Sequence, residues 1–324
     1  MRRGLVIGKF MPIHQGHIAL INFAASHCDE LIVSMSFTDD DLIQNELRFS
    51  WIVELFANQS NIHIYKLKDD FDDDTLSWEA RTKLWAQKVR KVYPPIHLIV
   101  SSEVYGKPFA DNLSAEHLLF DADRKNTPVS AMLIRQKPYK YWDFILPVVR
   151  PYFVKKICFY GPESTGKSTL AKKMAELYQT EFVPEVAREI ITSNDFTVDD
   201  IIQVGHAQTK RVLDKAKVAN KLLICDTDLI TTQIYSQIYL KQVPDVLYAL
   251  EKQVHYDAYF LFNIDVPWEE DGLRDLGTKR EEMMKMFKSE IDKRKIDYIM
   301  VSGDYQQREQ CVRTKLEALM KEVN

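Results

Sequence analysis

The sequence predicts an α/β protein of two domains, each with a parallel sheet flanked by helices. Short apolar runs alternate with amphipathic stretches along the whole chain, as in a parallel sheet covered by helices. Two glycine-containing junctions, beginning at Gly8 and Gly161, each connect an expected strand to an expected helix. Three prolines within residues 138–151 mark a boundary between the two arrays. A chain of 324 residues can bury two cores, and we expect domains at 1–150 and 151–324.

The apolar runs give the expected strands in order. In the first half they are residues 5–7, 31–35, 62–65 and 98–101, and in the second half residues 157–160, 182–183, 222–225, 259–262 and 298–301. A helix is expected over residues 78–92. The acidic residues 69–74 precede this helix, where negative charge is favourable, so we prefer a solvated approach to the helix over a metal site.

Composition narrows the class of protein. A net charge of −4 without a dense basic cluster argues against a nucleic-acid partner. The apolar segments are too short to span a membrane, and no secretory leader is expected at the N-terminus. The four cysteines, Cys28, Cys158, Cys225 and Cys311, lie far apart, as expected of buried thiols in a reducing compartment. We therefore expect a cytoplasmic protein whose partners are small molecules, and whether it forms a homo-oligomer stays open.

The first junction has the residues of a phosphate-binding site. A strand ends at Gly8, residues 10–12 form a turn, and His14 and His17 project to the same side at the start of a helix. Gly16 leaves room for a nucleotide, while the helix N-terminus and the imidazoles supply hydrogen-bond donors. This arrangement suits attack on an α-phosphorus with pyrophosphate leaving, because the catalyst must mainly stabilise charge.

Residues 8–17, Gly-Lys-Phe-x-Pro-x-His-x-Gly-His, resemble the HxGH nucleotidyltransferase superfamily, and in particular its nicotinamide mononucleotide (NMN) adenylyltransferase branch. A second family element is matched by residues 129–135, in which Arg135 corresponds to the arginine that grips the outgoing phosphates. The resemblance implies a Rossmann-like domain with His14, His17 and Arg135 as catalytic residues. It also implies an ATP site that includes Gly8, Lys9, Phe10, Gly16 and Ser130.

Met132 departs from this family pattern, which usually has Thr or Ser at its position. Its side chain cannot donate a hydrogen bond to a triphosphate. Two interpretations stay open: an active, slower adenylyltransferase, which we favour, and a degenerate nucleotide-sensing domain. For the NMN side, the resemblance suggests Ser102, Tyr105 and Trp85, although packing is an alternative role for the tryptophan.

The second junction, GxxxxGKS at residues 161–168, is a more specific motif for nucleotide binding than the first junction. Loop amides would cradle the β-phosphate, Lys167 would reach the transferring γ-phosphate, and Ser168 would bind Mg²⁺. A kinase or other NTPase that uses ATP is implied. The residues expected to bind this ATP are Gly161, Ser164, Thr165, Gly166, Ser168 and Thr169.

Carboxylates at strand ends supply the remaining candidates in this half. Asp226 ends an apolar strand in a position suited to holding Mg²⁺. Glu185 follows another strand, and either Glu185 or Asp226 could be the base for the acceptor hydroxyl. Arg188 and Asp228 are candidate substrate ligands near these positions.

A segment after residue 265 has the features of a lid over ATP. Arg274 and Arg280 are spaced across a stretch that contains glycine, and closure would bring their charges to the phosphates. A solvated basic helix is the alternative. Trp268 and Asp271 in this segment are candidate substrate contacts.

The order of these motifs in the second half resembles the ribosylnicotinamide kinase domain of NadR-type bifunctional proteins, and the resemblance covers nearly the full chain. It implies phosphorylation of nicotinamide riboside to NMN, followed by adenylylation of NMN to NAD. With Gly8 already in the catalytic motif, the helix-turn-helix regulator of some relatives is not expected. A coenzyme A pathway fusion, and a kinase joined to a sensing domain, are the rival interpretations.

Overall fold

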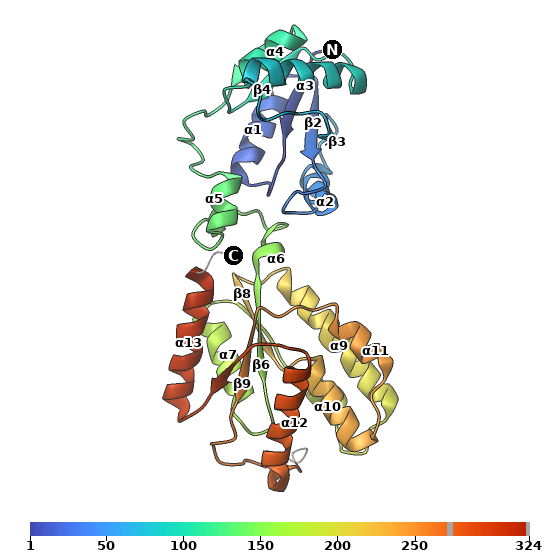
Figure 1. Ribbon diagram of the computed structural model, residues 1–324, viewed down its shortest axis with the longest axis vertical. Coiled ribbons are helices and arrows are strands. Elements are labelled where there is room, and N and C mark those ends of the chain that lie inside the picture. The colour runs from blue at the N-terminus through green and yellow to red at the C-terminus, as the bar shows by residue number, and fades with distance from the viewer. Residues whose placement is uncertain (271–274, 322–324) are drawn as a thin grey trace. The chain divides into compact units, whose positions relative to one another are not determined.

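The computed structural model describes residues 1–270 and 275–321, and the chain divides between Val149 and Arg150 into two compact units. Each unit is an α/β fold with one sheet of five parallel strands flanked by helices (Figure 1), which confirms the predicted fold class. Among the described residues, no helix has both the length and the apolar content needed to span a bilayer.

The first unit alternates strands and helices from its first residues. Its elements are β1 (Arg3–Gly8), α1 (Gln15–Ala25), β2 (Glu30–Phe37), α2 (Asn45–Phe56), β3 (Ile62–Lys68), α3 (Trp78–Val92), β4 (Leu98–Ser101), α4 (Gly106–Leu113), β5 (Glu116–Leu119), α5 (Ala131–Gln136) and the short 3-10 helix η1 (Trp142–Phe144). The strand order is β3-β2-β1-β4-β5. The strand β5 was not predicted, because its four residues lie at the sheet edge and include no continuous apolar run.

The second unit repeats this organisation. Its elements are α6 (Arg150–Phe153), β6 (Lys155–Tyr160), α7 (Lys167–Leu177), β7 (Glu181–Val183), α8 (Ala187–Ile190), α9 (Val198–Ala216), β8 (Leu222–Asp226), α10 (Leu229–Leu240), α11 (Asp245–Glu251), β9 (Ala258–Phe262), η2 (Gly277–Lys279), α12 (Arg280–Lys293), β10 (Tyr298–Val301) and α13 (Tyr305–Lys321). The strand order is β10-β9-β6-β8-β7.

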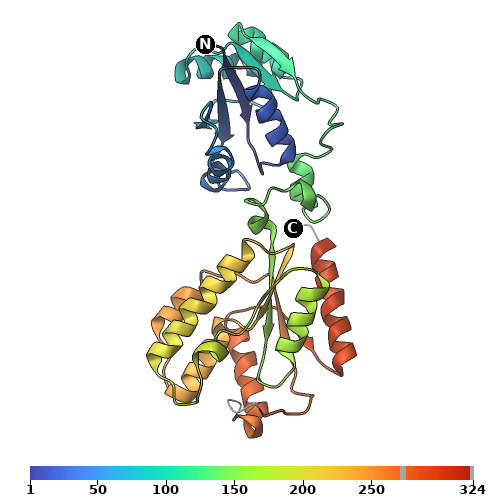
Figure 2. The same ribbon diagram turned by 180° about the vertical axis from the view of Figure 1, so that it is seen from behind.

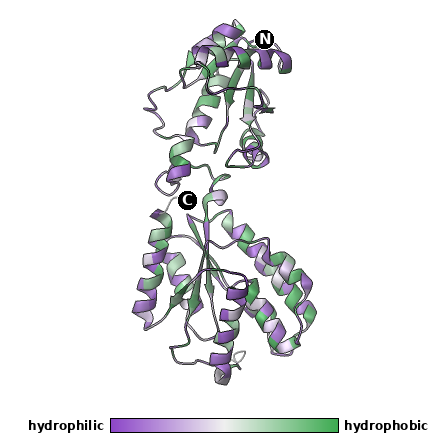
Figure 3. Ribbon diagram, viewed as in Figure 1, coloured by the Kyte–Doolittle hydropathy of each residue, from purple (hydrophilic) through white to green (hydrophobic). Residues whose placement is uncertain are grey.

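Each sheet is buried by helices on its two faces. In the second unit, Phe159 of β6 packs in a cluster with α7 and α13, whereas Tyr160 packs in another with α10 and α12. Figure 2 shows α7 and α13 together on one side of this sheet. In the first unit, Leu5 of β1 contacts the cluster formed with α3 and α4. Figure 3 shows apolar residues in the strands of both sheets, and β8 and β9 are buried along their whole length, as expected for strands covered on both faces.

The strand orders place both predicted junctions at equivalent positions. The strand β1 lies between β2 and β4, and β6 lies between β8 and β9. In each sheet, the next strands in the chain are added on one side of this strand and the later strands on its other side, so the strand order reverses there. In open α/β sheets, ligands bind at the carboxyl ends of the strands at this switch point. The fold thus puts the loops that begin at Gly8 and Gly161 where a ligand site is expected in each unit.

Candidate active sites

The first site is built on the loop between β1 and α1. His14 caps α1: its backbone is extended, and its Nδ1 accepts a hydrogen bond from the Gly16 N–H at 3.1 Å. A Cβ at Gly16 would lie 3.0 Å from the His14 ring, so a side chain there would press on the imidazole. The position of the His14 ring is therefore fixed by a local capping hydrogen bond, and the absence of a side chain at Gly16 leaves room for the ring.

His14 and His17 stack at the start of α1, with ring centroids 3.8 Å apart, and the Phe10 ring contacts His17 edge-on at 5.0 Å. Burial lowers the pKa of His14 to about 4, with a further contribution from the charge of Arg124. Burial, His14 and Arg124 together hold the pKa of His17 well below its usual value. Both rings are therefore neutral near pH 7. The buried His17 Nδ1 has no hydrogen-bond partner among the described residues, so the pair retains capacity to bind phosphate oxygens.

The helix α5 supplies the second part of this site. Ser130 caps α5 by accepting a hydrogen bond from the Leu133 N–H at 3.2 Å, and Arg135 donates from Nη1 to the Met11 carbonyl oxygen. The segment that carries Arg135 is thereby held against the loop after β1. Met132 is 55% exposed, so its side chain does not fill a core position. Its presence cannot be explained by packing in this unit.

Arg124 was missed by the sequence analysis. It follows β5, donates from Nη2 to Glu103 Oε1 at 2.8 Å, and its charge acts on both imidazoles. Its loop is organised by Asp121, whose carboxylate accepts hydrogen bonds from the backbone N–H groups of residues 125–127. A single arginine in a polar loop gives no distinctive pattern, and its position depends on the unpredicted strand β5.

A cavity of about 270 Å³ opens beside this motif. It is lined by Gly8 and Lys9 on one side and by the aromatic residues Trp85, Tyr105 and Phe109 on another. The Trp85 ring lies 5.3 Å from Tyr105 and 5.8 Å from Phe109. The predicted substrate residues Trp85 and Tyr105 are thus brought together, while Ser102 does not line this cavity.

The acidic segment before α3 requires a correction. We expected residues 69–74 to be solvated, and Asp70, Asp73 and Asp74 are exposed, but Asp72 pairs with Arg81, whose Nε lies 2.9 Å from Asp72 Oδ1. Asp69 and Asp72 both line the 270 Å³ cavity, and Asp69 Oδ1 is buried without a hydrogen-bond partner within residues 1–270 and 275–321. Burial and the charge of Asp72 raise the pKa of Asp69. The sequence shows the acidic run itself. It does not show that the chain after β3 runs beside the aromatic residues of α3, where Asp69 and Asp72 become partly buried.

The second site is built on the loop between β6 and α7. Gly161 and Gly166 have φ values of +134° and +80°, which favour glycine. A Cβ at Gly161 would also lie 2.9 Å from the Phe262 carbonyl oxygen. The Thr165 hydroxyl closes the loop by donating to the Pro162 carbonyl oxygen at 2.8 Å. Backbone N–H groups and the N-terminus of α7 then form a site for anions.

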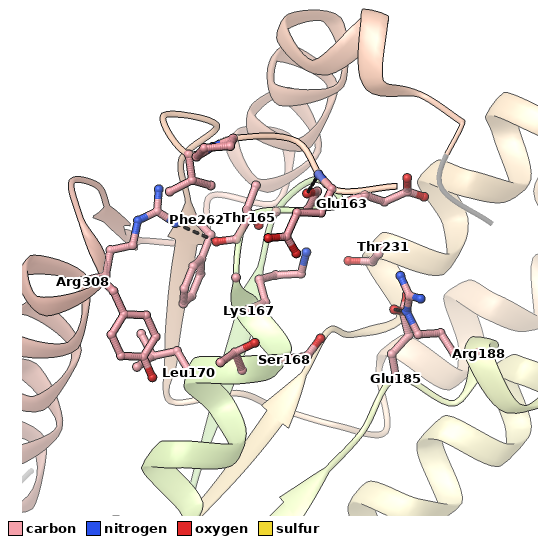
Figure 4. Close-up of a pocket in the computed structure, with 18 of the residues that line it drawn as sticks. Glu163, Thr165, Lys167, Ser168, Leu170, Glu185, Arg188, Thr231, Phe262 and Arg308 are labelled. Atoms are coloured by element: carbon pink, nitrogen blue, oxygen red, sulfur yellow. Dashed lines mark hydrogen bonds and ion pairs between the residues drawn. The ribbon is translucent and has the colours of Figure 1, made fainter. Parts of the chain in front are cut away.

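Lys167 is the first residue of α7, and its Nζ donates to the Pro162 carbonyl oxygen at 2.6 Å. Burial lowers its pKa, while the charges of Asp226, Glu185 and Glu163 act in the opposite direction. Lys167 and Glu163 point into the cavity from the loop, and Glu185 and Arg188 approach from the other side (Figure 4). Lys167 therefore lies among three carboxylates, and Arg188 is a second cation nearby.

Asp226 at the end of β8 can hold a divalent cation. It is buried, the Ser168 side chain interacts with its carboxyl group, and its Oδ1 has no hydrogen-bond partner in the described part of the chain. Burial raises the pKa of Asp226 to about 6, and Lys167 opposes this shift. A hydroxyl and a carboxylate are ligands that Mg²⁺ accepts, together with nucleotide phosphates. The unpartnered oxygen thus fits the predicted role of Ser168 and Asp226.

The loop opens into a cavity of about 290 Å³, whose lining includes the predicted residues Ser164, Thr165, Ser168 and Thr169. A smaller adjoining cavity of about 90 Å³ is lined by Phe196, Tyr235 and Tyr239. Glu185 and Arg188 line both, and Glu185 Oε2 pairs with Arg188 Nε at 3.1 Å. The structure therefore provides a phosphate cavity next to an aromatic one.

Asp228 has a different place from the one we predicted. It caps α10, where Oδ1 accepts hydrogen bonds from the Thr231 N–H and hydroxyl at 3.0 and 3.1 Å. Its Oδ2 accepts a hydrogen bond from the Tyr259 hydroxyl at 3.1 Å, and neither cavity includes it. Asp228 is a buried helix cap, whereas Asp226, which lines neither cavity itself, lies close enough to Lys167 and Ser168 to interact with both. The Asp-Thr-Asp pattern could not show which carboxylate lies beside the loop.

The predicted lid is described in part. Arg280 donates to the Val266 carbonyl oxygen at 2.7 Å and to the Ser164 carbonyl oxygen at 3.3 Å, and it lies over the Trp268 ring at 5.7 Å. Arg280 is thus connected to the phosphate loop, while Trp268 supports the arginine from outside the cavities described above. Asp271 and Arg274 lie outside the described residues.

Arg308 is a second residue that sequence analysis missed. It lies on α13, is 3% exposed, and donates from Nη1 to the Thr165 carbonyl oxygen at 2.6 Å. It also donates to the Gly303 carbonyl oxygen at 2.8 Å and pairs with Asp265. This side chain ties three loops at the carboxyl edge of the sheet. An arginine in the first turn of an amphipathic helix gives no sign of such a role.

These two sites define an α/β protein with two nucleotide-binding domains, the second carrying a phosphate loop. A family model described as an AAA domain matches residues 156–308. The chain is 30% identical to the trifunctional NAD biosynthesis/regulator protein NadR of Escherichia coli strain K12, over 94% of this chain and 80% of that protein. It is 31% identical to the nicotinamide-nucleotide adenylyltransferase of Methanocorpusculum labreanum, over 32% of this chain and 59% of that protein.

Solved structures agree on the fold. A crystal structure of NadR protein in complex with NR matches with a TM-score of 0.80 and 21% identity, over 100% of this chain and 96% of that one. Another, of NadR protein in complex with NAD and AMP-PNP, matches with a TM-score of 0.79. The chain belongs to the NadR family, and it is an enzyme of NAD biosynthesis.

Proposed function

We propose that the chain catalyses two consecutive steps of NAD salvage. The second domain phosphorylates nicotinamide riboside to NMN with ATP, and the first transfers an adenylyl group from ATP to NMN, which gives NAD and pyrophosphate. The observation that supports this most directly is the presence of two separately built phosphate sites, each at the switch point of its own sheet. The solved relatives bind nicotinamide riboside, NAD and AMP-PNP, which are the substrate, the product and an ATP analogue of this scheme.

In the second domain, Lys167 neutralises the transferring phosphoryl group, and the loop from Gly161 to Gly166 holds the phosphates. Mg²⁺ supplies further charge neutralisation when it is bound by Ser168, Asp226 and the nucleotide. Arg280 would close on the phosphates from its place beside Ser164. The aromatic cavity lined by Tyr235 and Tyr239 accommodates the pyridine ring of the riboside.

In the first domain, the neutral His14 and His17 donate hydrogen bonds to the phosphates of ATP, and Arg135 neutralises the outgoing pyrophosphate. The cavity lined by Trp85 and Tyr105 receives NMN beside the Gly8 loop. The NMN adenylyltransferase relative supports this half of the proposal. Arg124 adds a positive charge beside the imidazoles once phosphates are present.

The test is an assay of the purified chain with nicotinamide riboside, ATP and Mg²⁺, in which NMN and NAD are followed separately. We expect NMN to form first and NAD to follow, and supplied NMN to give NAD directly. NMN formation without NAD from either substrate would support a kinase with a nucleotide-sensing first domain. Turnover of phosphopantetheine or dephospho-coenzyme A in place of the pyridine substrates would support the coenzyme A interpretation.

A further inference from the structure

Glu163 stands between the two cavities of the second domain. It is the third residue of the phosphate loop, four residues before Lys167, and it lines both the 290 Å³ phosphate cavity and the 90 Å³ aromatic cavity. An acceptor whose ring occupies the aromatic cavity must present its hydroxyl to the γ-phosphate near this border. The position of Glu163 therefore matches the place where the phosphoryl group changes oxygens.

The carboxyl group of Glu163 is only partly satisfied by the protein. The Tyr235 side chain lines the same two cavities and interacts with this carboxyl group, whereas Oε2 is buried and has no hydrogen-bond partner among the residues that the structure describes. A buried acceptor without a partner is costly, and native proteins usually retain one only where a ligand, an ion or water completes it. An acceptor hydroxyl would supply the missing hydrogen bond.

The two carboxylates that the sequence suggested as the base, Glu185 and Asp226, each have another partner or role. Glu185 is paired with Arg188 at 3.1 Å, which reduces its capacity to accept a proton. Asp226 interacts with Ser168 and is the carboxylate that fits Mg²⁺. Glu163 is the member of the group that has neither an arginine partner nor a metal role. Its immediate connection to the loop also fixes its distance from the phosphates.

We propose that Glu163 accepts the proton of the substrate hydroxyl during phosphoryl transfer. The inference rests on the proposed kinase function of this domain. The hydroxyl oxygen attacks the γ-phosphorus, the bond between that phosphorus and the β,γ-bridging oxygen breaks, and ADP leaves with the electron pair. The hydroxyl proton passes to Glu163 Oε2 and then to solvent, so no further reactant is needed. Tyr235 holds the carboxyl group in place as a positioning residue.

The electrostatic surroundings support this role. Burial, followed by the charge of Glu185, raises the pKa of Glu163 to about 7, while Lys167 and Arg188 oppose the shift. A base works best when its pKa lies near the working pH. The charged and titratable groups that face Glu163 are Lys167 of α7, Glu185 and Arg188 after β7, Tyr235 and Tyr239 of α10, and Asp275. Activity should rise with pH as Glu163 loses its proton.

The experiment compares the wild-type chain with Glu163→Gln, which keeps the size of the side chain and removes its basicity. Glu176→Gln is the matched control, because Glu176 is exposed on α7 and makes no contribution to either cavity. Three quantities are measured: kcat for nicotinamide riboside phosphorylation, the ATP dissociation constant by calorimetry, and the pH dependence of kcat/KM for the riboside between pH 5.5 and 9.

We expect Glu163→Gln to lower kcat about a hundredfold or more, the scale of a lost general base, with ATP binding within about threefold of wild type. The part of the acid limb centred near pH 7 should be absent in Glu163→Gln and retained in Glu176→Gln, whereas a fall near pH 6 set by Asp226 should be common to all three proteins. A kcat above about a tenth of the wild-type value, a limb near pH 7 retained in Glu163→Gln or a comparable loss of ATP binding would each overturn the role. A wild-type chain that phosphorylates no nucleoside would instead refute the proposed function, and the inference would fall with it.

Discussion

Replacement of Lys167 by Ala is the most direct test of the proposed phosphate site in the second domain. Lys167 Nζ lies 2.6 Å from the Pro162 carbonyl oxygen, inside the loop that would surround the β- and γ-phosphates. Its loss removes the cation from a group of three carboxylates, Glu163, Glu185 and Asp226. The bound nucleotide then adds its own negative charge to an acidic site in which Arg188, already paired with Glu185, is the nearby cation that remains.

The magnitude follows from the transition state. Removing one preorganised donor from an active site costs about 2.7–4 kcal/mol, or about 10²–10³ in rate. The loss of rate in Lys167→Ala should lie at or above the upper end of this range, because the lost donor is charged and the carboxylates around it remain. Their mutual repulsion should also raise the pKa of Glu163 above about 7, so that activity which remains at neutral pH falls further.

The assay follows NMN formation from nicotinamide riboside and, separately, NAD formation from supplied NMN. Lys167→Ala should lose at least about a thousandfold in the first rate and leave the second unchanged, since the first domain has its own core. Lys172→Ala, an exposed position on the same helix, is the control for effects on α7. Riboside phosphorylation within tenfold of the control would refute the assignment of this loop.

Three further predictions concern the first domain. His17→Ala should lower adenylylation of NMN about a hundredfold or more through loss of a buried donor, with riboside phosphorylation as the internal control; an unchanged NAD rate would contradict the HxGH interpretation. Met132→Thr should raise the NAD rate up to about tenfold, since a hydrogen bond to a charged group contributes about 1.5–3 kcal/mol; binding of ATP without turnover in both proteins would indicate a sensor. Burial lowers the pKa of His14 from 6.5 to about 4. As pH falls through this range, the unfolded chain binds a proton at this ring that the folded chain does not bind. The free energy of unfolding should therefore fall by about 3 kcal/mol between pH 6.5 and pH 4. Urea unfolding of wild type and His14→Gln across this range should show that difference, and parallel pH profiles would contradict the buried, neutral state.

The sequence predicted the fold well because both sheets are parallel and buried. Strands covered on both faces appear as continuous apolar runs, and β4 and β10 have the predicted bounds. The strand β5 was missed because an edge strand of four residues, with Glu116 exposed, carries no such run. The loop after β5, and Arg124 within it, could not be placed for the same reason.

Residues joined by local spacing were also predictable. His14, Gly16 and His17 act through a helix cap, and Gly161 and Gly166 act through backbone conformations, so short motifs contain the necessary information. Arg308 and Glu163 depend on contacts between segments far apart in the chain. Arg308 reaches the carbonyl group of Thr165, 143 residues away. Patterns of composition and period do not encode such contacts.

The acidic residues show how burial changes an interpretation. Asp226 and Asp228 are two residues apart, yet one interacts with Lys167 and Ser168 and the other caps α10 through Thr231. Asp72 looked solvated from its neighbours in sequence, but Arg81 one helix turn into α3 pairs with it. Only the path of the chain around each carboxylate distinguishes a ligand, a cap and an ion pair.

The claim of two independent, consecutive active sites is tested most directly by mixing two inactive proteins. Lys167→Ala and His17→Ala each interrupt one step, so neither alone should convert nicotinamide riboside to NAD. A mixture of the two should make NAD, because NMN released by the His17→Ala protein is adenylylated by the Lys167→Ala protein. NAD formation by either variant alone at the wild-type rate, or none from the mixture when wild type is active, would contradict the account.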